Sequence, residues 1–313
     1  MLQGYGVQIA YKHNYKIGRK KFNHFLMVKL PSIFFRNLKG TRSVQAMIRI
    51  EIKRGFISWS FLTIFLFATA IPTLYVIINI LPVYPVNSFL EARFFNVFYK
   101  WIGMNSFSFE TQLLYFLLPI FSSIPYASSY LLDEQTGFIK NIYSRTKKSS
   151  YLISKFISNF IVGGTAFFLP IIINLVIVSL ILPSVHPEIV DGATSINYKS
   201  MWAELFYTHP YIYIFSYAIL NFGFGGLFAT VGLACSVFVN RIFVVILCPF
   251  ILYLFLFFGF QLTGNPALIP FKYLIPGQPV RGITLSIVLI QFFTLLIIST
   301  IVFFGGIRKR EIY

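Results

Sequence analysis

Long apolar runs without a single charged side chain dominate this sequence. The runs Ile57–Leu81 and Ile242–Leu262 contain no Asp, Glu, Lys, Arg or His. An uncharged apolar stretch of about 18 residues or more is typical of a transmembrane helix. The whole chain is 57% hydrophobic and 11% charged, whereas a soluble domain carries roughly 25% charged residues. The sequence therefore predicts an integral membrane protein.

The runs divide the chain into an all-α polytopic domain with six transmembrane helices. A basic extension, residues 1–40, precedes a six-span domain, residues 41–313, which opens with an interfacial amphipathic helix at residues 41–55. The segment 263–283 is rich in proline and glycine and predicts broken pieces at the external membrane surface before the last span. The six predicted spans are residues 57–81, 111–132, 156–182, 210–239, 242–262 and 284–307.

The distribution of basic residues predicts the orientation of these spans. Lys and Arg concentrate in loops that stay cytoplasmic. Both ends of the chain and the 133–155 loop are basic, and an even number of spans places them on one side. We therefore expect both termini in the cytoplasm. Of the 26 Lys and Arg residues, only five lie in the alternate loops: Arg93, Lys100, Lys199, Lys272 and Arg281.

The sequence contains no pattern of an active site, a metal site or a cofactor site. No histidine pair has metal-ligand spacing, and there is no Gly-rich phosphate loop with its lysine. We therefore expect no catalytic residue, no metal and no cofactor. Cys235 and Cys248 lie in apolar runs and suit packing. A net charge of +17 would suggest nucleic acid in a soluble protein, but these charges flank membrane spans, so no nucleic acid partner is expected.

The stretch 133–155 is the most polar connection between predicted spans. It begins with Asp133 and Glu134, continues through Gly137, and carries five basic residues. Phe138, Ile139, Ile142 and Tyr143 have helical spacing and would share one apolar face.

A second pattern lies in the fourth span. Gly225, Ala229, Gly232 and Ser236 recur at helical spacing. Small residues allow another helix to approach closely, so this face predicts helix packing, either within the chain or between two copies.

The order of these features resembles the permease subunit of bacterial type-2 ATP-binding-cassette (ABC) transporters. The segment Asp133 to Asn141 is similar to that family's acid, glycine and apolar-basic helix, and Tyr151 and Lys155 precede the third span as in many members. The resemblance covers residues 42–313. It implies an ABC ATPase partner subunit, a second permease chain, location in the plasma membrane, and export of a hydrophobic or amphipathic substrate such as an antimicrobial peptide or antibiotic.

The resemblance also implies a cytoplasmic coupling helix, Gly137–Ser149, that inserts into a groove of the ATPase. Its apolar face would fill the groove, Glu134 would lie near its N-terminal end, and Arg145 and the neighbouring lysines would meet acids or lipid phosphates. Three alternatives remain open: the 133–155 loop is only a solvated connector, the protein is a non-transporting membrane scaffold or immunity protein, or it is a secondary transporter. The uncharged spans disfavour the last of these.

Overall fold

The computed structural model describes residues 43–85, 88–188, 196 and 200–309. The chain divides into two units, Met1–Ala46 and Met47–Tyr313. In the first unit only the start of helix α2 (Ser43–Phe56) is described, and the predicted extension 1–40 lies outside the described residues. Everything below concerns the second unit, whose described part is helical and contains no strand.

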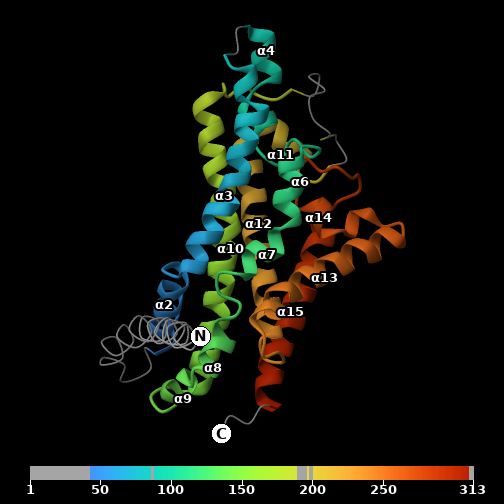
Figure 1. The fold of residues 1–313 in the computed structure, drawn as a ribbon. Coiled ribbons are helices and arrows are strands. Elements are labelled where there is room, and N and C mark those ends of the chain that lie inside the picture. Colours follow the sequence, from blue (N-terminus) through green and yellow to red (C-terminus); the bar gives the residue numbers. More distant parts are fainter. Residues whose placement is uncertain (1–42, 86–87, 189–195, 197–199, 310–313) are drawn as a thin grey trace, which may run out of the picture. The chain divides into compact units, whose positions relative to one another are not determined.

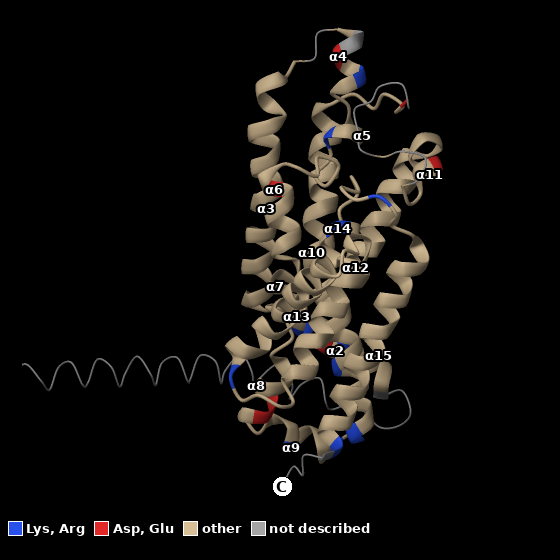
Figure 2. Ribbon diagram, turned by 90° about the vertical axis from the view of Figure 1, so that its right-hand side faces the viewer, with Lys and Arg blue, Asp and Glu red and all other residues tan. Residues whose placement is uncertain are grey.

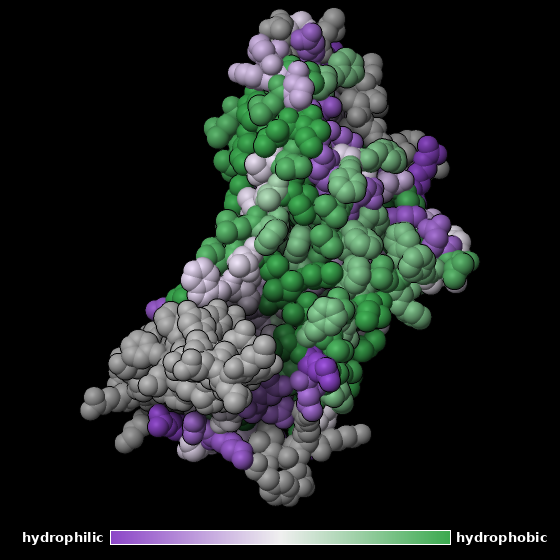
Figure 3. Space-filling model, viewed as in Figure 1, coloured by the Kyte–Doolittle hydropathy of each residue, from purple (hydrophilic) through white to green (hydrophobic). Residues whose placement is uncertain are grey.

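Five helices are long and apolar enough to cross a membrane, which confirms an all-α multi-pass architecture (Figure 1). Most Lys, Arg, Asp and Glu residues lie towards the two ends of the bundle (Figure 2), and the surface between them is largely apolar (Figure 3). The five helices are α3 (Trp59–Asn79), α10 (Lys148–Ile181), α12 (Pro210–Cys235), α13 (Ile242–Leu262) and α15 (Leu285–Lys309).

These helices follow closely the apolar runs of the sequence. The α13 helix has the predicted bounds, and α3 starts after Ser58, whose side chain caps the helix by accepting a hydrogen bond from the Phe61 amide at 3.1 Å. Two helix ends differ by more than two residues from the prediction. The α10 helix begins at Lys148 and not at Phe156, and α12 ends at Cys235 and not at Val239. The residues from Lys148 to Lys155 therefore belong to the long helix and not to the preceding loop.

The predicted span 111–132 is not one continuous helix. It is divided into α6 (Phe109–Phe116), α7 (Leu118–Ser123) and α8 (Ser129–Gln135). Pro119 occupies the first turn of α7, and Pro125 follows its end; proline lacks an amide donor and restricts the residue before it. The pieces are enclosed by protein, because α6 packs against α3 and α7 packs against α3, α10, α12 and α13. Enclosure of this kind lets an interrupted helix lie at membrane depth.

Short helices make up the remaining connections. The segment between α13 and α15 is broken, as its prolines predict, and is attached to α12: the Tyr213 hydroxyl donates to the Pro276 carbonyl at 2.5 Å, and Asn221 donates to the Leu274 carbonyl at 3.4 Å. The short helices are η2 (Leu81–Val83), α4 (Phe89–Phe94), α5 (Val97–Lys100), α9 (Phe138–Tyr143), α11 (Ala203–Thr208), η4 (Pro266–Leu268) and α14 (Pro270–Tyr273).

The α12 helix lies at the centre of the bundle. In the apolar 18-residue stretch of α12, 67% of the residues are buried. In the corresponding stretches of α13 and α15 only 17% are buried. Its small-residue face packs within the chain: a Cβ at Gly225 would lie 3.0 Å from Ser122 Oγ, and one at Gly232 would lie 3.0 Å from Ala127 Cβ. The residue of α10 that faces Gly225 is also a glycine, Gly163.

The closest approach in this packing is at Gly163. A Cβ there would lie 2.3 Å from Ala229 Cβ and 2.7 Å from the Ser122 carbonyl, distances that neither neighbour can relieve without moving a helix. We expect Gly163→Ala to cost about 1–3 kcal/mol and to lower the melting temperature of the detergent-purified protein. The control is Gly259→Ala in α13, where a Cβ meets nothing within 4 Å. Equal melting temperatures for the two variants would contradict this packing.

Candidate functional site

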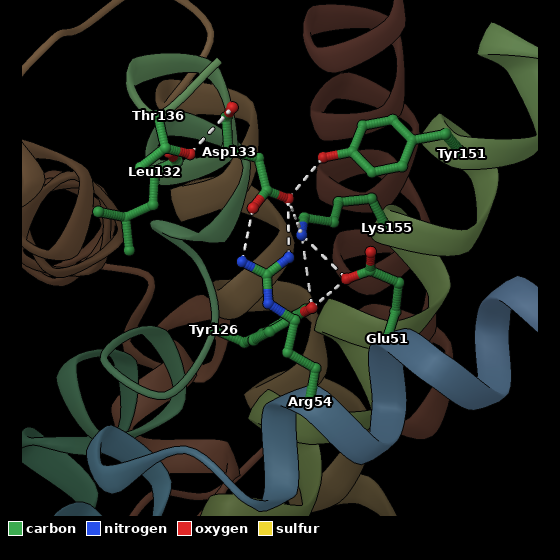
Figure 4. A network of polar contacts seen from close by, with 8 residues as sticks. All are labelled: Glu51, Arg54, Tyr126, Leu132, Asp133, Thr136, Tyr151 and Lys155. Carbon is green, nitrogen blue, oxygen red and sulfur yellow. Dashed lines mark hydrogen bonds and ion pairs between the residues drawn. The ribbon is translucent and has the colours of Figure 1, made fainter. Parts of the chain in front are cut away.

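A network of four charged side chains, three of them buried and Arg54 half-buried, lies at the end of the bundle where α8 and α9 meet the start of α10 (Figure 4). Lys155 is fully buried, and its Nζ lies 2.6 Å from Asp133 Oδ2 and 2.9 Å from Glu51 Oε2. Arg54 holds Asp133 from the other side, with its two terminal nitrogens 2.6 and 3.1 Å from the two carboxylate oxygens. We call Glu51, Arg54, Asp133 and Lys155 the ion network.

Two tyrosine hydroxyls complete the ion network. Tyr151 donates to Asp133 Oδ2 at 2.7 Å, and Tyr126 donates to Glu51 Oε2. The Lys155 ammonium also lies 4.9 Å from the centre of the Tyr126 ring, within range of a cation–π attraction. Every carboxylate is therefore bonded to at least one cation and one hydroxyl, which is the condition under which buried charge is tolerated.

Local helix geometry places each member of the ion network. Glu51 and Arg54 are three residues apart on α2 and so share one face, and Tyr151 and Lys155 are four apart on α10 and do the same. The interruption between α7 and α8 brings Tyr126 close to Glu51. The ion network thus joins α2 to α8 and α10, both of which are far from α2 in the sequence.

The ion network contains two acids and two basic residues, so their charges balance. The opposite charges also shift the pKa values of Asp133 and Arg54. Burial alone would raise the pKa of Asp133, but Lys155 and Arg54 together hold it below its ordinary value. Burial alone would lower the pKa of Arg54, but the Asp133 carboxylate and its hydrogen bonds raise it above the usual range. Both groups are therefore charged at neutral pH.

These shifts predict how stability depends on pH. Because the folded pKa of Asp133 lies below its ordinary value of 3.8, its contribution is fully present above that value and is lost as the pH falls through the folded value. We expect the melting temperature of the wild type to be level from about pH 7 to about pH 5 and to fall below about pH 4. In Asp133→Asn the fall should be shallower. Parallel curves for the two proteins would contradict this assignment.

The predicted coupling segment forms a helix shorter than expected. Gly137 adopts the left-handed conformation (φ 70°), as a turn between two helices requires, and α9 covers only Phe138–Tyr143, so the predicted helix Gly137–Ser149 is wrong in length. The residues that follow turn at Ser144 and Arg145 and enter α10 at Lys148. Glu134 lies in α8, three residues before Gly137.

The apolar face of α9 faces the protein's own interior. Ile139 and Ile142 are 1% and 2% exposed, and the half-buried Phe138 ring lies 5.4 Å from the Arg54 guanidinium. The Tyr143 ring packs edge-on to Tyr151, 5.9 Å between centroids. The expectation that this face fills a groove of another subunit does not fit this burial. The exposed surface of α9 and of the residues that follow it is instead basic, because Lys140, Arg145, Lys147 and Lys148 are exposed.

Sequence reasoning missed the ion network. Hydropathy places Lys155 in the loop 133–155, and the amphipathic pattern of residues 41–55 predicts no buried partner for Glu51. The available signal was that Glu51 is the single acid in a basic entry helix, with an i+3 arginine. Among the described residues no group of three or more His, Cys, Asp and Glu side chains is placed to hold a metal ion.

Comparisons with known proteins identify no relative of this chain: no protein-family description, curated protein sequence or solved structure matches it.

Proposed function

We propose that this chain is the membrane-spanning permease subunit of an ATP-driven exporter of the type-2 ABC class. It would move a hydrophobic or amphipathic substrate, such as an antimicrobial peptide or antibiotic, across the plasma membrane. It would have no enzyme activity of its own, and a separate ABC ATPase would hydrolyse the ATP. The resemblance of residues 42–313 to that family motivates the proposal, and the ion network is the observation that carries it.

The ion network supports a mechanical role for the end of the bundle that contains α9. Asp133 of α8, the helix before α9, forms ion pairs with Arg54 of α2 and Lys155 of α10. A push on α9 would therefore reach α10, which extends without a break from Lys148 to Ile181. A solvated connector has no need of buried ion pairs to neighbouring helices, whereas a lever that transmits force does.

Six crossings and cytoplasmic termini belong to the same proposal. The α3 helix ends near α4 at one end of the bundle, and α8 and α9 lie at the other (Figure 1). The chain returns between them through α6, α7 and the start of α8, and residues 111–132 would make the sixth crossing. The exposed basic residues around α9 would face the cytoplasm.

We also propose that two permease chains form the translocation unit. The α13 and α15 helices leave most of their apolar surface uncovered within one chain, which supports a face for lipid and for a second copy. The small-residue face of α12 is already used inside the chain and would not contribute to the interface between copies.

Co-purification from the native membrane in a mild detergent tests the proposal. We expect an ABC ATPase subunit to be recovered with the tagged chain in equal amount. Recovery of the chain with no ATPase, from membranes that contain both, would favour a non-transporting scaffold or immunity protein.

A further inference from the structure

Two histidines share a cavity at the end of α10 that lies away from the ion network (Figure 1). His186 follows α10, His209 directly precedes α12, and both line a cavity of about 280 Å³ between these two places. Both residues are exposed, so an ion can reach them from solvent. Their spacing in the sequence matches no metal-ligand motif, and only the fold brings the two imidazoles to one cavity.

The hydrogen bond that His186 makes within its own segment fixes the tautomer of its ring. The Nδ1 atom lies 3.1 Å from the Pro187 carbonyl oxygen. Because a carbonyl only accepts, Nδ1 must carry the proton, and the neutral ring then presents an unprotonated Nε2 with its lone pair. A backbone carbonyl that holds the other ring nitrogen in this way is the usual support of a histidine that binds metal through Nε2.

The Nε2 atom faces a second acceptor at a distance that suits two ligands of one metal ion. His186 Nε2 lies 3.5 Å from the Thr208 carbonyl oxygen. An N–H···O hydrogen bond is about 2.7–3.2 Å long, so a proton shared by these two atoms would make a poor bond. Nitrogen and oxygen ligands lie about 2.0–2.2 Å from a tetrahedral zinc ion, which separates two ligands by about 3.3–3.6 Å. The gap between Nε2 and the carbonyl oxygen therefore matches one edge of such a tetrahedron.

The other residues that line the cavity indicate which metal ions it suits. The Ser184 and Tyr211 hydroxyls share a hydrogen bond of 2.9 Å beside the histidines, where they would hold a metal-bound water. The Phe98 ring packs edge-on against Tyr211, 4.9 Å between centroids, and holds it in place. None of the described residues that line the cavity is acidic. Ca²⁺ and Mg²⁺ need sets of oxygen ligands, whereas imidazole suits zinc, copper and nickel.

We propose that His186, His209 and the Thr208 carbonyl bind a divalent transition-metal ion of the zinc, copper and nickel class. His209 supplies the third ligand because it follows Thr208 directly and its side chain lines the same cavity. The bound ion joins the segment after α10 to the start of α12 and so stabilises the folded chain by mass action. This site goes beyond the proposed transport function and does not depend on an ATPase partner.

Thermal unfolding of the full chain in a non-ionic maltoside detergent tests this site. The chain is purified without a polyhistidine tag, stripped with a chelator and titrated with zinc chloride or magnesium chloride. We expect zinc, and not magnesium, to raise the melting temperature, and the wild type to retain an equimolar amount of zinc after gel filtration. His186→Gln should need at least about tenfold more zinc for the same shift. If that variant does not fold, His209→Gln replaces it and should weaken the response in the same way.

The matched control uses the two remaining histidines of the chain, His13 and His24, which lie outside the described residues. His13→Gln combined with His24→Gln should keep the full response to zinc. Loss of the response in this control, an equal shift with magnesium, or an unchanged response in both His186→Gln and His209→Gln would overturn the proposal. Stabilisation by mild acid with no response to zinc would also overturn it, because the two carbonyls then bind an imidazolium and not a metal-bound ring.

Discussion

Replacing Lys155 by methionine is expected to be the most damaging single substitution in the chain. It would leave the carboxylates of Asp133 and Glu51 buried, with only Arg54 to balance them. Breaking a buried ion pair by removing one partner costs about 3–5 kcal/mol. Methionine fills a similar volume, so the loss would be electrostatic and not a packing defect. The measurement is the melting temperature and the yield of monodisperse protein in detergent.

Two comparisons separate this effect from a general loss of lysine. Lys147→Met removes an exposed lysine at the start of the same helix and should leave the melting temperature nearly unchanged. Glu51→Gln combined with Lys155→Met should recover part of the loss, because one of the two orphaned carboxylates is then neutral. Strictly additive effects of the two substitutions would show that Glu51 and Lys155 are not coupled.

Charge reversal on the exposed side of α9 is expected to separate this chain from the ATPase that we propose as its partner. Lys140 and Arg145 are exposed and make no ion pair with a described residue, so Lys140→Glu with Arg145→Glu should fold normally. At an interface with acids on a partner, like charges placed opposite each other cost several kcal/mol. We expect recovery of the ATPase and its stimulated ATP hydrolysis to fall at least about tenfold.

The matched control for this variant is Arg281→Glu, an exposed arginine in the segment before α15. It should leave ATPase recovery unchanged. If the double reversal also recovers normal amounts of ATPase with normal stimulated activity, the basic surface around α9 is only a solvated connector.

The long helices could be predicted from the sequence because each is an apolar run whose length is set by the membrane. The α13 helix has the predicted bounds because Arg241 precedes the apolar run and Thr263 follows it. Hydropathy misplaces the start of α10, because a span predicted from hydropathy stops at the first charged residue. In the structure Lys155 lies inside the helix, and Asp133 and Glu51 neutralise its charge. Pairing between residues 104 positions apart leaves no periodic trace in the sequence.

The short elements differed for local reasons. Pro119 and Pro125 interrupt the predicted second span in the sequence. That the span becomes three separate helices depends on the packing of α7 against α3, α10, α12 and α13. The apolar spacing of Phe138, Ile139, Ile142 and Tyr143 predicted a helix at α9 and the structure has one. Spacing alone does not say what the apolar face contacts, and here Ile139 and Ile142 contact the protein itself.

A photo-cross-linking amino acid placed at Lys140 tests most directly the proposal that the exposed side of α9 docks on an ATPase. The full chain carrying it would be irradiated in native membranes, and the adduct would be identified by mass spectrometry. The same probe at Lys272, in α14 about halfway along the bundle and away from α9 (Figure 1), gives the background. The proposal predicts an adduct with an ABC ATPase from Lys140 and none from Lys272. Adducts from Lys140 with lipid alone, or with proteins that bind no ATP, would contradict it.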